Sequence, residues 1–95
     1  MRSDFDAIHN HHERAVLAAV QAGAARHPGI GDAEHLADVA CVALNRLPPR
    51  YIRHEVDFAF YLSDKERAET DTAISEAVAS AFEFVRARVA MRARS

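Results

Sequence analysis

Mostly apolar residues recur at steps of three and four along the first quarter of the chain, which places them on one face of a helix. Ser3, with Asp6 three residues later, resembles a capping box. Pro28 and Gly29 indicate a loop, so the pattern predicts a helix from about Ser3 to near His27. The positions on its predicted buried face are Phe5, Ile8, His12, Val16, Ala19, Val20 and Gly23.

A second apolar stripe follows the loop. Asp32 is a good N-cap and Glu34 lies in the first turn, where a carboxylate favours helix formation. Pro48 disfavours helical geometry at Leu47, so we expect the helix to end there. Val42 lies off the stripe and is a candidate contact with a partner. The stripe consists of Leu36, Val39, Ala40, Ala43, Leu44 and Leu47.

Between residues 51 and 62 the apolar positions alternate with polar ones. This period of two predicts a short extended segment, although a continuation as helix stays open for residues 52–62. A single strand must pair with another, and the same strand in a second copy is one candidate partner. The alternating apolar residues are Ile52, Val56, Phe58, Phe60 and Leu62.

Ser63 and Glu66 form a second capping-box pattern before the last helix, which we expect to run to about Val89 and fray into the arginine-rich end. Its apolar stripe is Ile74, Ala77, Val78, Ala81, Phe82, Val85 and Val89. The predicted fold is therefore mainly α, a small single domain spanning residues 1–95. It has three helices, with a short extended segment between the second and the third.

The length and the net charge of the chain restrict the classes of protein to which it can belong. A chain of 95 residues is one domain with a modest core, so pairing into a homodimer would stabilise it. The net charge of −2 argues against direct nucleic-acid binding. No stretch has the length of a membrane span, and the start lacks an apolar signal-peptide segment. We therefore expect a cytoplasmic protein without membrane contact.

The single cysteine, Cys41, excludes a disulfide within the chain and a four-cysteine zinc site. It lies in an apolar helical run, so we interpret it as a small core residue, consistent with a reducing compartment. His9 and His12 share a helix face and would hold a metal only if His35 or His54 folded back to them. A solvated turn with a partly buried His12 is favoured, and no metal or cofactor is expected. Without a phosphate loop, an H-E-x-x-H motif or a nucleophile elbow, the chain is not expected to be an enzyme and no catalytic residue is assigned.

The segment "NRLPPRYIRH" is the richest in binding chemistry. Pro48 and Pro49 make the backbone rigid. Guanidinium groups bind phosphate or the Hoogsteen edge of guanine through paired donors, and a phenol ring offers a stacking face. The corner therefore suits a small anionic ligand that contains a base; the alternative is a helix stop surrounded by solvated arginines. The side chains around it are Asn45, Arg46, Arg50, Tyr51, Arg53 and His54.

The longer segment "DVACVALNRLPPRYI" closely resembles the late-competence ComFB family, whose hallmark is D-[IV]-x-x-x-A-L-N-x-L-P-P-x-Y. The matching positions are Asp38, Val39, Ala43, Leu44, Asn45, Leu47, Pro48, Pro49 and Tyr51. "HNHHERAVLAAV" resembles the family's N-x-x-E-x-x-V signature through Asn10, Glu13 and Val16.

This resemblance implies a helical bacterial homodimer that binds a cyclic dinucleotide and relays the signal to an unknown downstream protein. Cyclic di-GMP is the first candidate ligand and cyclic di-AMP the second. Arginines would contact phosphate or guanine, and Asp57 or Glu55 would accept hydrogen bonds from guanine N1 and N2. The expected ligand-binding residues are Asn45, Arg46, Arg50, Tyr51, Arg53, His54 and Asp57. The alternative is a purely structural dimerisation module without a small ligand.

Overall fold

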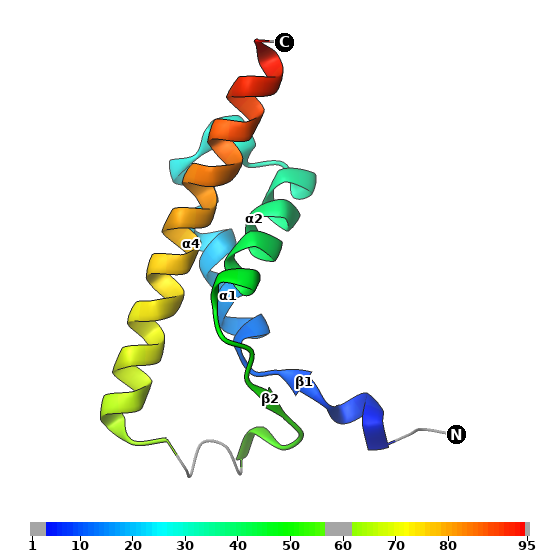
Figure 1. Ribbon diagram of the computed structural model, residues 1–95, viewed down its shortest axis with the longest axis vertical. Helices are drawn as coiled ribbons and strands as arrows, with labels where there is room; N and C mark the ends of the chain where they lie inside the picture. Colours follow the sequence, from blue (N-terminus) through cyan, green and yellow to red (C-terminus); the bar gives the residue numbers. More distant parts are fainter. Residues whose placement is uncertain (1–3, 57–61, 95) are drawn as a thin grey trace.

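The computed structural model describes residues 4–56 and 62–94, and it confirms a mainly α fold with three α-helices in these ranges (Figure 1). The helices are α1 (His12–Gly23), α2 (Ala33–Arg46) and α4 (Asp64–Ala93). Two short strands, β1 (His9–Asn10) and β2 (Tyr51–Ile52), form an antiparallel pair. Short 3₁₀ turns cover Asp4–Ala7, Ala24–Arg26 and Pro28–Ile30.

The first helix begins later than the sequence pattern predicted. α1 starts at His12, and residues 4–10 form a 3₁₀ turn and strand β1 instead. Phe5 is 79% exposed and Ile8 is also exposed, so these two residues do not extend the core face of α1. The reason is a competing long-range contact, because the backbone of residues 9–10 hydrogen-bonds to β2. The predicted end of this helical region, near His27, agrees with the structure. α1 ends at Gly23, and the 3₁₀ turn Ala24–Arg26 follows it directly.

Both ends of α2 are confirmed. The side chain of Asp32 accepts a hydrogen bond from the backbone N–H of His35, as an N-cap does. Leu47 is extended, with φ −101° and ψ 139°, which is the conformation favoured before a proline. Cys41, predicted to be a core residue, is exposed, because it lies off the buried face formed by Val39, Ala40 and Ala43. Val42 packs against the edge of this chain's own core.

The extended segment is shorter than predicted, and its partner lies in the same chain. β2 covers only Tyr51 and Ile52, which pair with Asn10 and His9 of β1. The partner of these two residues is therefore β1 of the same chain, and not the candidate partner named from the sequence, the same strand in a second copy. Glu55 and Val56 have helical geometry. The rest of the predicted alternation, including Asp57, Phe58 and Phe60, lies outside the described residues.

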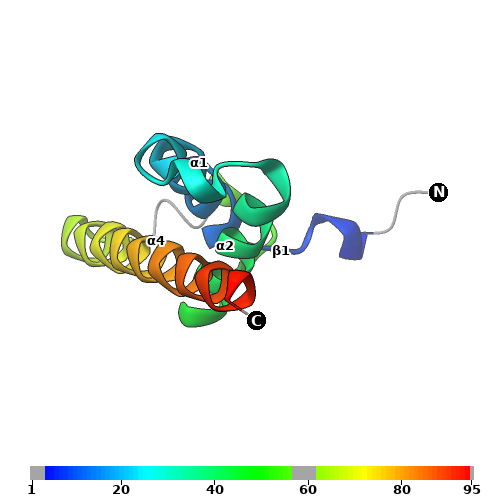
Figure 2. The same cartoon turned by 90° about the horizontal axis from the view of Figure 1, so that it is seen from above.

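The last helix begins as predicted and ends later. Ser63 caps α4 by accepting a hydrogen bond from the backbone N–H of Glu66 at 3.1 Å. The helix continues through Ala93 instead of fraying after Val89, because the residues that follow are alanine, arginine and methionine, all strong helix formers. α4 packs against both α1 and α2 (Figure 2). Its last turns extend past these two helices (Figure 1).

The core lies where the three helices meet. Its buried members are Val16, Val20, Ile30, Val39, Ala40, Ala43, Leu47, Ile74, Ala77, Val78, Ala81, Phe82 and Val85. No helix in the described ranges is both long enough and apolar enough to cross a membrane. The radius of gyration is 15.5 Å, against about 12 Å for a compact chain of this length. The protruding N-terminal arm and the long α4 account for the difference (Figure 1).

Candidate functional site

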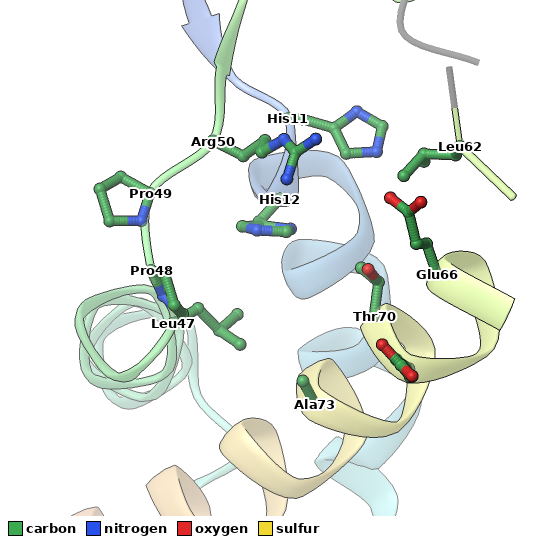
Figure 3. Close-up of a pocket in the computed structure, with 11 residues that line it drawn as sticks. His11, His12, Leu47, Pro48, Pro49, Arg50, Leu62, Glu66, Thr70 and Ala73 are labelled. Carbon is green, nitrogen blue, oxygen red and sulfur yellow. The ribbon is translucent and has the colours of Figure 1, made fainter. Parts of the chain in front are cut away.

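A pocket of about 330 Å³ opens between the start of α1, the Pro48–Pro49 corner and the first turns of α4 (Figure 3). This volume is at the lower end of the range for small-molecule sites, about 300–1,000 Å³. Its lining residues are His11, His12, Leu47, Pro48, Pro49, Arg50, Leu62, Glu66, Glu69, Thr70 and Ala73.

The proline corner forms one wall, and local contacts fix its position. Leu47 is buried and anchors the end of α2 in the core. Beyond the prolines, the backbone N–H of His11 donates to the carbonyl of Arg50 at 2.7 Å. The backbone of Arg50 is therefore held beside the first turn of α1, and its side chain lines the pocket.

Asn10 joins these two parts of the chain. Its side-chain Oδ1 accepts from the backbone N–H of His12 and from that of Arg50, both at 3.2 Å. Asn10 is only 9% exposed, so these bonds lie in a largely dry environment. The sequence pattern alone does not reveal this role, although the N-x-x-E-x-x-V signature begins at Asn10.

His12 contributes a neutral imidazole to the pocket. Burial lowers the pKa of His12 below its ordinary value of 6.5, and the neighbouring His11 and Arg50 lower it further. A hydrogen bond to the Pro48 carbonyl acts in the opposite direction on this pKa but does not cancel the shift. At neutral pH the pocket therefore gains no positive charge from His12.

Complementary groups face one another across the pocket (Figure 3). The guanidinium of Arg50 comes from the corner side, and the carboxylate of Glu66 comes from α4 together with the hydroxyl of Thr70. Glu69 of α4 also lines the pocket. One wall thus offers a charged hydrogen-bond donor, and the other offers acceptors. Such an arrangement suits a ligand that carries both an anionic group and N–H donors.

Of the expected ligand residues within the described ranges, Arg50 is the one that lines this pocket. Asn45 donates to the carbonyl of Cys41 at 2.9 Å, so its amide is used within α2. Arg46 hydrogen-bonds to the hydroxyl of Ser80, and its guanidinium lies 5.4 Å from the centre of the Phe84 ring. Arg46 therefore attaches the end of α2 to α4.

The other predicted ligand residues lie on strand β2 or shortly after it, and none of them lines the pocket. Arg53 pairs with Asp4 at 3.6 Å, and Tyr51 is 68% exposed on β2. His54 is exposed, and Asp57 lies outside the described residues. The sequence also missed Glu66, Glu69 and Thr70 as pocket residues, because only helix packing brings α4 opposite the proline corner.

The histidines do not gather into a metal centre. Within residues 4–56 and 62–94, no group of three or more His, Cys, Asp or Glu side chains has the proximity to hold a metal ion. His9 instead lies 3.6 Å from the carboxylate of Glu55, and His35 hydrogen-bonds to Asp32. The pKa of His9 is raised, first by a hydrogen bond to the carbonyl of Ala7 and also by Glu55.

Comparison with known protein families identifies the chain. The model of the ComFB family, described as late competence development protein, matches residues 9–89. The chain belongs to the ComFB family. The ComFB match includes all the residues that line the pocket, and also Asn10, which holds the backbone of His12 and Arg50. No curated protein and no solved structure gives a match.

Proposed function

We propose that this ComFB protein is a cytoplasmic receptor for a cyclic dinucleotide, with cyclic di-GMP preferred over cyclic di-AMP, and that it relays binding to a downstream protein. The observation that supports this proposal is the pocket at the Pro48–Pro49 corner, where Arg50 stands opposite Glu66 and where Glu69 also lines the wall. No bond is made or broken in this function.

The chemistry of the two walls supports the guanine preference. Arg50 would donate to a phosphate oxygen in a charge-assisted hydrogen bond. Glu66 and Glu69 would accept from N1–H and N2–H of guanine, a donor pair that adenine lacks on that edge. Tyr51 on β2 and His54, two residues after this strand, are exposed and would contact the parts of the ligand that extend beyond the pocket.

Calorimetry with cyclic di-GMP, cyclic di-AMP and a linear dinucleotide tests the proposal. A charge-assisted hydrogen bond is worth roughly 1.5–3 kcal/mol, so Arg50→Ala should weaken cyclic di-GMP binding by about tenfold or more. Arg50→Lys should recover only part of this affinity, because lysine restores the charge but not the planar fork. Arg94→Ala, at the exposed far end of α4, is the matched control and should bind like the wild type.

A second variant tests the base preference. Glu69→Gln keeps the size of the side chain but replaces one acceptor oxygen with a donor. It should weaken cyclic di-GMP more than cyclic di-AMP. If Arg50→Ala stays folded and binds as tightly as the wild type, the pocket is not the site. The structural dimerisation module would then be the better interpretation of the proline corner.

A further inference from the structure

A groove of about 380 Å³ lies between α2 and the last turns of α4, and it shares no lining residue with the pocket at the proline corner. Three valines give it an apolar lining. Val85 is buried, and Val42 and Val89 are partly buried against the core. The groove therefore has an apolar base that the packing of α2 and α4 holds in place.

Two guanidinium groups line this groove on the α4 side. Arg88 and Arg92 are four positions apart, so they are neighbours on one face of the helix. The guanidinium of Arg88 lies 5.7 Å from the centre of the Phe84 ring, a contact that uses the flat face of the group and leaves its N–H edge available. The α4 wall thus offers donors spaced by one helical turn, which suits a ligand with more than one anionic group.

The α2 side of the groove does not neutralise these arginines. Asp38 is the one carboxylate among the described lining residues, and it forms no ion pair within residues 4–56 and 62–94. Two arginines against one aspartate leave the groove with an excess of positive charge. The side chain of Asp38 also remains available as an acceptor for a hydrogen bond from a ligand.

The end of α4 continues this positive surface beyond the groove. After Glu83, every charged residue in the described part of the chain is an arginine. The last turns of α4 project past α1 and α2 (Figure 1), and Met91 is 70% exposed there. A ligand seated in the groove can therefore continue along α4. A segment of protein chain has that reach, whereas a small molecule that fills the groove does not.

We propose that this groove binds an acidic segment of a partner protein, in which carboxylates alternate with apolar side chains. The apolar side chains would contact the valine base, and the carboxylates would pair with Arg88 and Arg92. Asp38 would accept from a backbone N–H of the segment. Nucleic acid fits less well, because its phosphates gain nothing from an apolar base and the chain carries a net charge of −2.

The position of the groove relates it to the pocket at the corner, a step that rests on the proposed function. Both sites use α2 and α4, at opposite ends of the two helices: the pocket includes Leu47 and Glu69, and the groove includes Asp38 and Arg88. Glu69 and Arg88 are roughly 28 Å apart along α4. The partner would then be the downstream protein, and any effect of the dinucleotide on its affinity must be reciprocal.

Fluorescence anisotropy without any dinucleotide tests the groove itself. The probe is a fluorescein-labelled peptide that alternates aspartate with leucine, and it should bind more tightly than a version with asparagine in place of aspartate. Arg88→Gln and Arg92→Gln should each weaken binding by roughly five- to tenfold. Arg86→Gln is the matched control and should bind like the wild type, because Arg86 pairs with Glu83 and does not line the groove.

Cys41 provides a reporter inside the groove that needs no substitution. It is exposed, it lines the groove, and it is the single cysteine of the chain. The aspartate peptide should slow the alkylation of Cys41 by N-ethylmaleimide, and the asparagine peptide should not. The protection should disappear in Arg88→Gln/Arg92→Gln, since this variant no longer holds the carboxylates.

Equal binding of the two peptides, or no protection of Cys41, would overturn the proposal. A DNA duplex that binds more tightly than the aspartate peptide would assign the arginines to nucleic acid, and a changed oligomeric state of Arg88→Gln would assign the groove to a second copy. Either result would overturn it too. If the peptide does not bind but cyclic di-GMP does, only the groove proposal fails. If the peptide binds but no dinucleotide does, only the proposed function and the coupling fail.

Discussion

Asn10 connects two segments that line the pocket, the start of α1 and the proline corner. One side-chain oxygen accepts from two backbone N–H groups that are far apart in the sequence, those of His12 and Arg50. Leaving a buried donor without a partner costs about 1–3 kcal/mol. Asn10 therefore matters both for folding and for the position of the Arg50 side chain.

We expect Asn10→Ala to lower the free energy of unfolding by about 2 kcal/mol, because both N–H groups lose their acceptor. Asn10→Asp keeps an acceptor oxygen and should recover part of the loss. Urea denaturation of the two variants gives the comparison. Equal stability of Asn10→Ala and the wild type would show that water replaces the side chain without cost.

His12 gives the protein a dependence on pH with a definite sign. Its pKa in the folded state is lowered, so the unfolded chain takes up the proton first. The stability that the neutral form of His12 contributes is fully present above the ordinary pKa of 6.5 and is lost as the pH falls through the folded pKa. His9 has the opposite sign, because its raised pKa makes the protonated form the stabilising one at low pH.

Denaturation between about pH 7 and 5 should show this difference. His12→Gln should lose less stability on acidification than the wild type, because it no longer has a proton to take up. His9→Gln serves as the contrasting variant and should lose more, since it lacks a stabilising protonation. Parallel curves for His12→Gln and the wild type would contradict the assigned direction.

At the scale of elements, α1 and α4 are in close contact at Gly23. A Cβ atom at this position would lie 2.8 Å from Cε2 and 3.2 Å from Cζ of Phe82. Phe82 is buried, and its ring stacks on His27 with the ring centres 4.2 Å apart. The ring therefore has little room to move, and glycine is required for this contact between the two helices.

Gly23→Ala should lower the free energy of unfolding by about 1–2 kcal/mol, because the overpacking exceeds the gain of about 1 kcal/mol in helix propensity. Gly29→Ala is the control, since a Cβ there would meet nothing within 4 Å. Its stability should stay within about 0.5 kcal/mol of the wild type. If Gly23→Ala proved as stable as the control, the Phe82 ring would have to possess more freedom than the packing indicates.

The helices also differ in how accurately the sequence predicted their ends. Asp32 and Ser63 cap their helices as expected, because each cap is made with a residue three positions later in the chain. The start of α1 was wrong by about nine residues because β1 forms a long-range pair with β2. A local period cannot reveal that competing contact.

For the whole molecule, we expect a fold that needs no metal ion. The core joins all three helices through apolar side chains, and the described histidines and acids form no cluster suited to a metal. Incubation with a chelator should leave the melting temperature unchanged, and elemental analysis of protein without a histidine tag should find no stoichiometric metal. A large fall in the melting temperature would show that a metal contributes to folding.

The sequence by itself determined the helical class, the ends of α2, the start of α4 and the ComFB family. These features depend on caps, prolines and motifs that act over a few neighbouring residues. It also predicted a ligand site at the proline corner, which stays a prediction; Arg50 lines a pocket at this corner.

Only the tertiary structure decided which residues share that pocket. Helix packing brings Glu66 and Glu69 of α4 opposite the corner, while Arg46 turns to Ser80 and Arg53 to Asp4. Cys41 is exposed for the same reason, because the face that a helix buries depends on where its neighbours lie. Side chains next to one another in the sequence can point to different faces, and contacts between distant segments depend on how the helices pack.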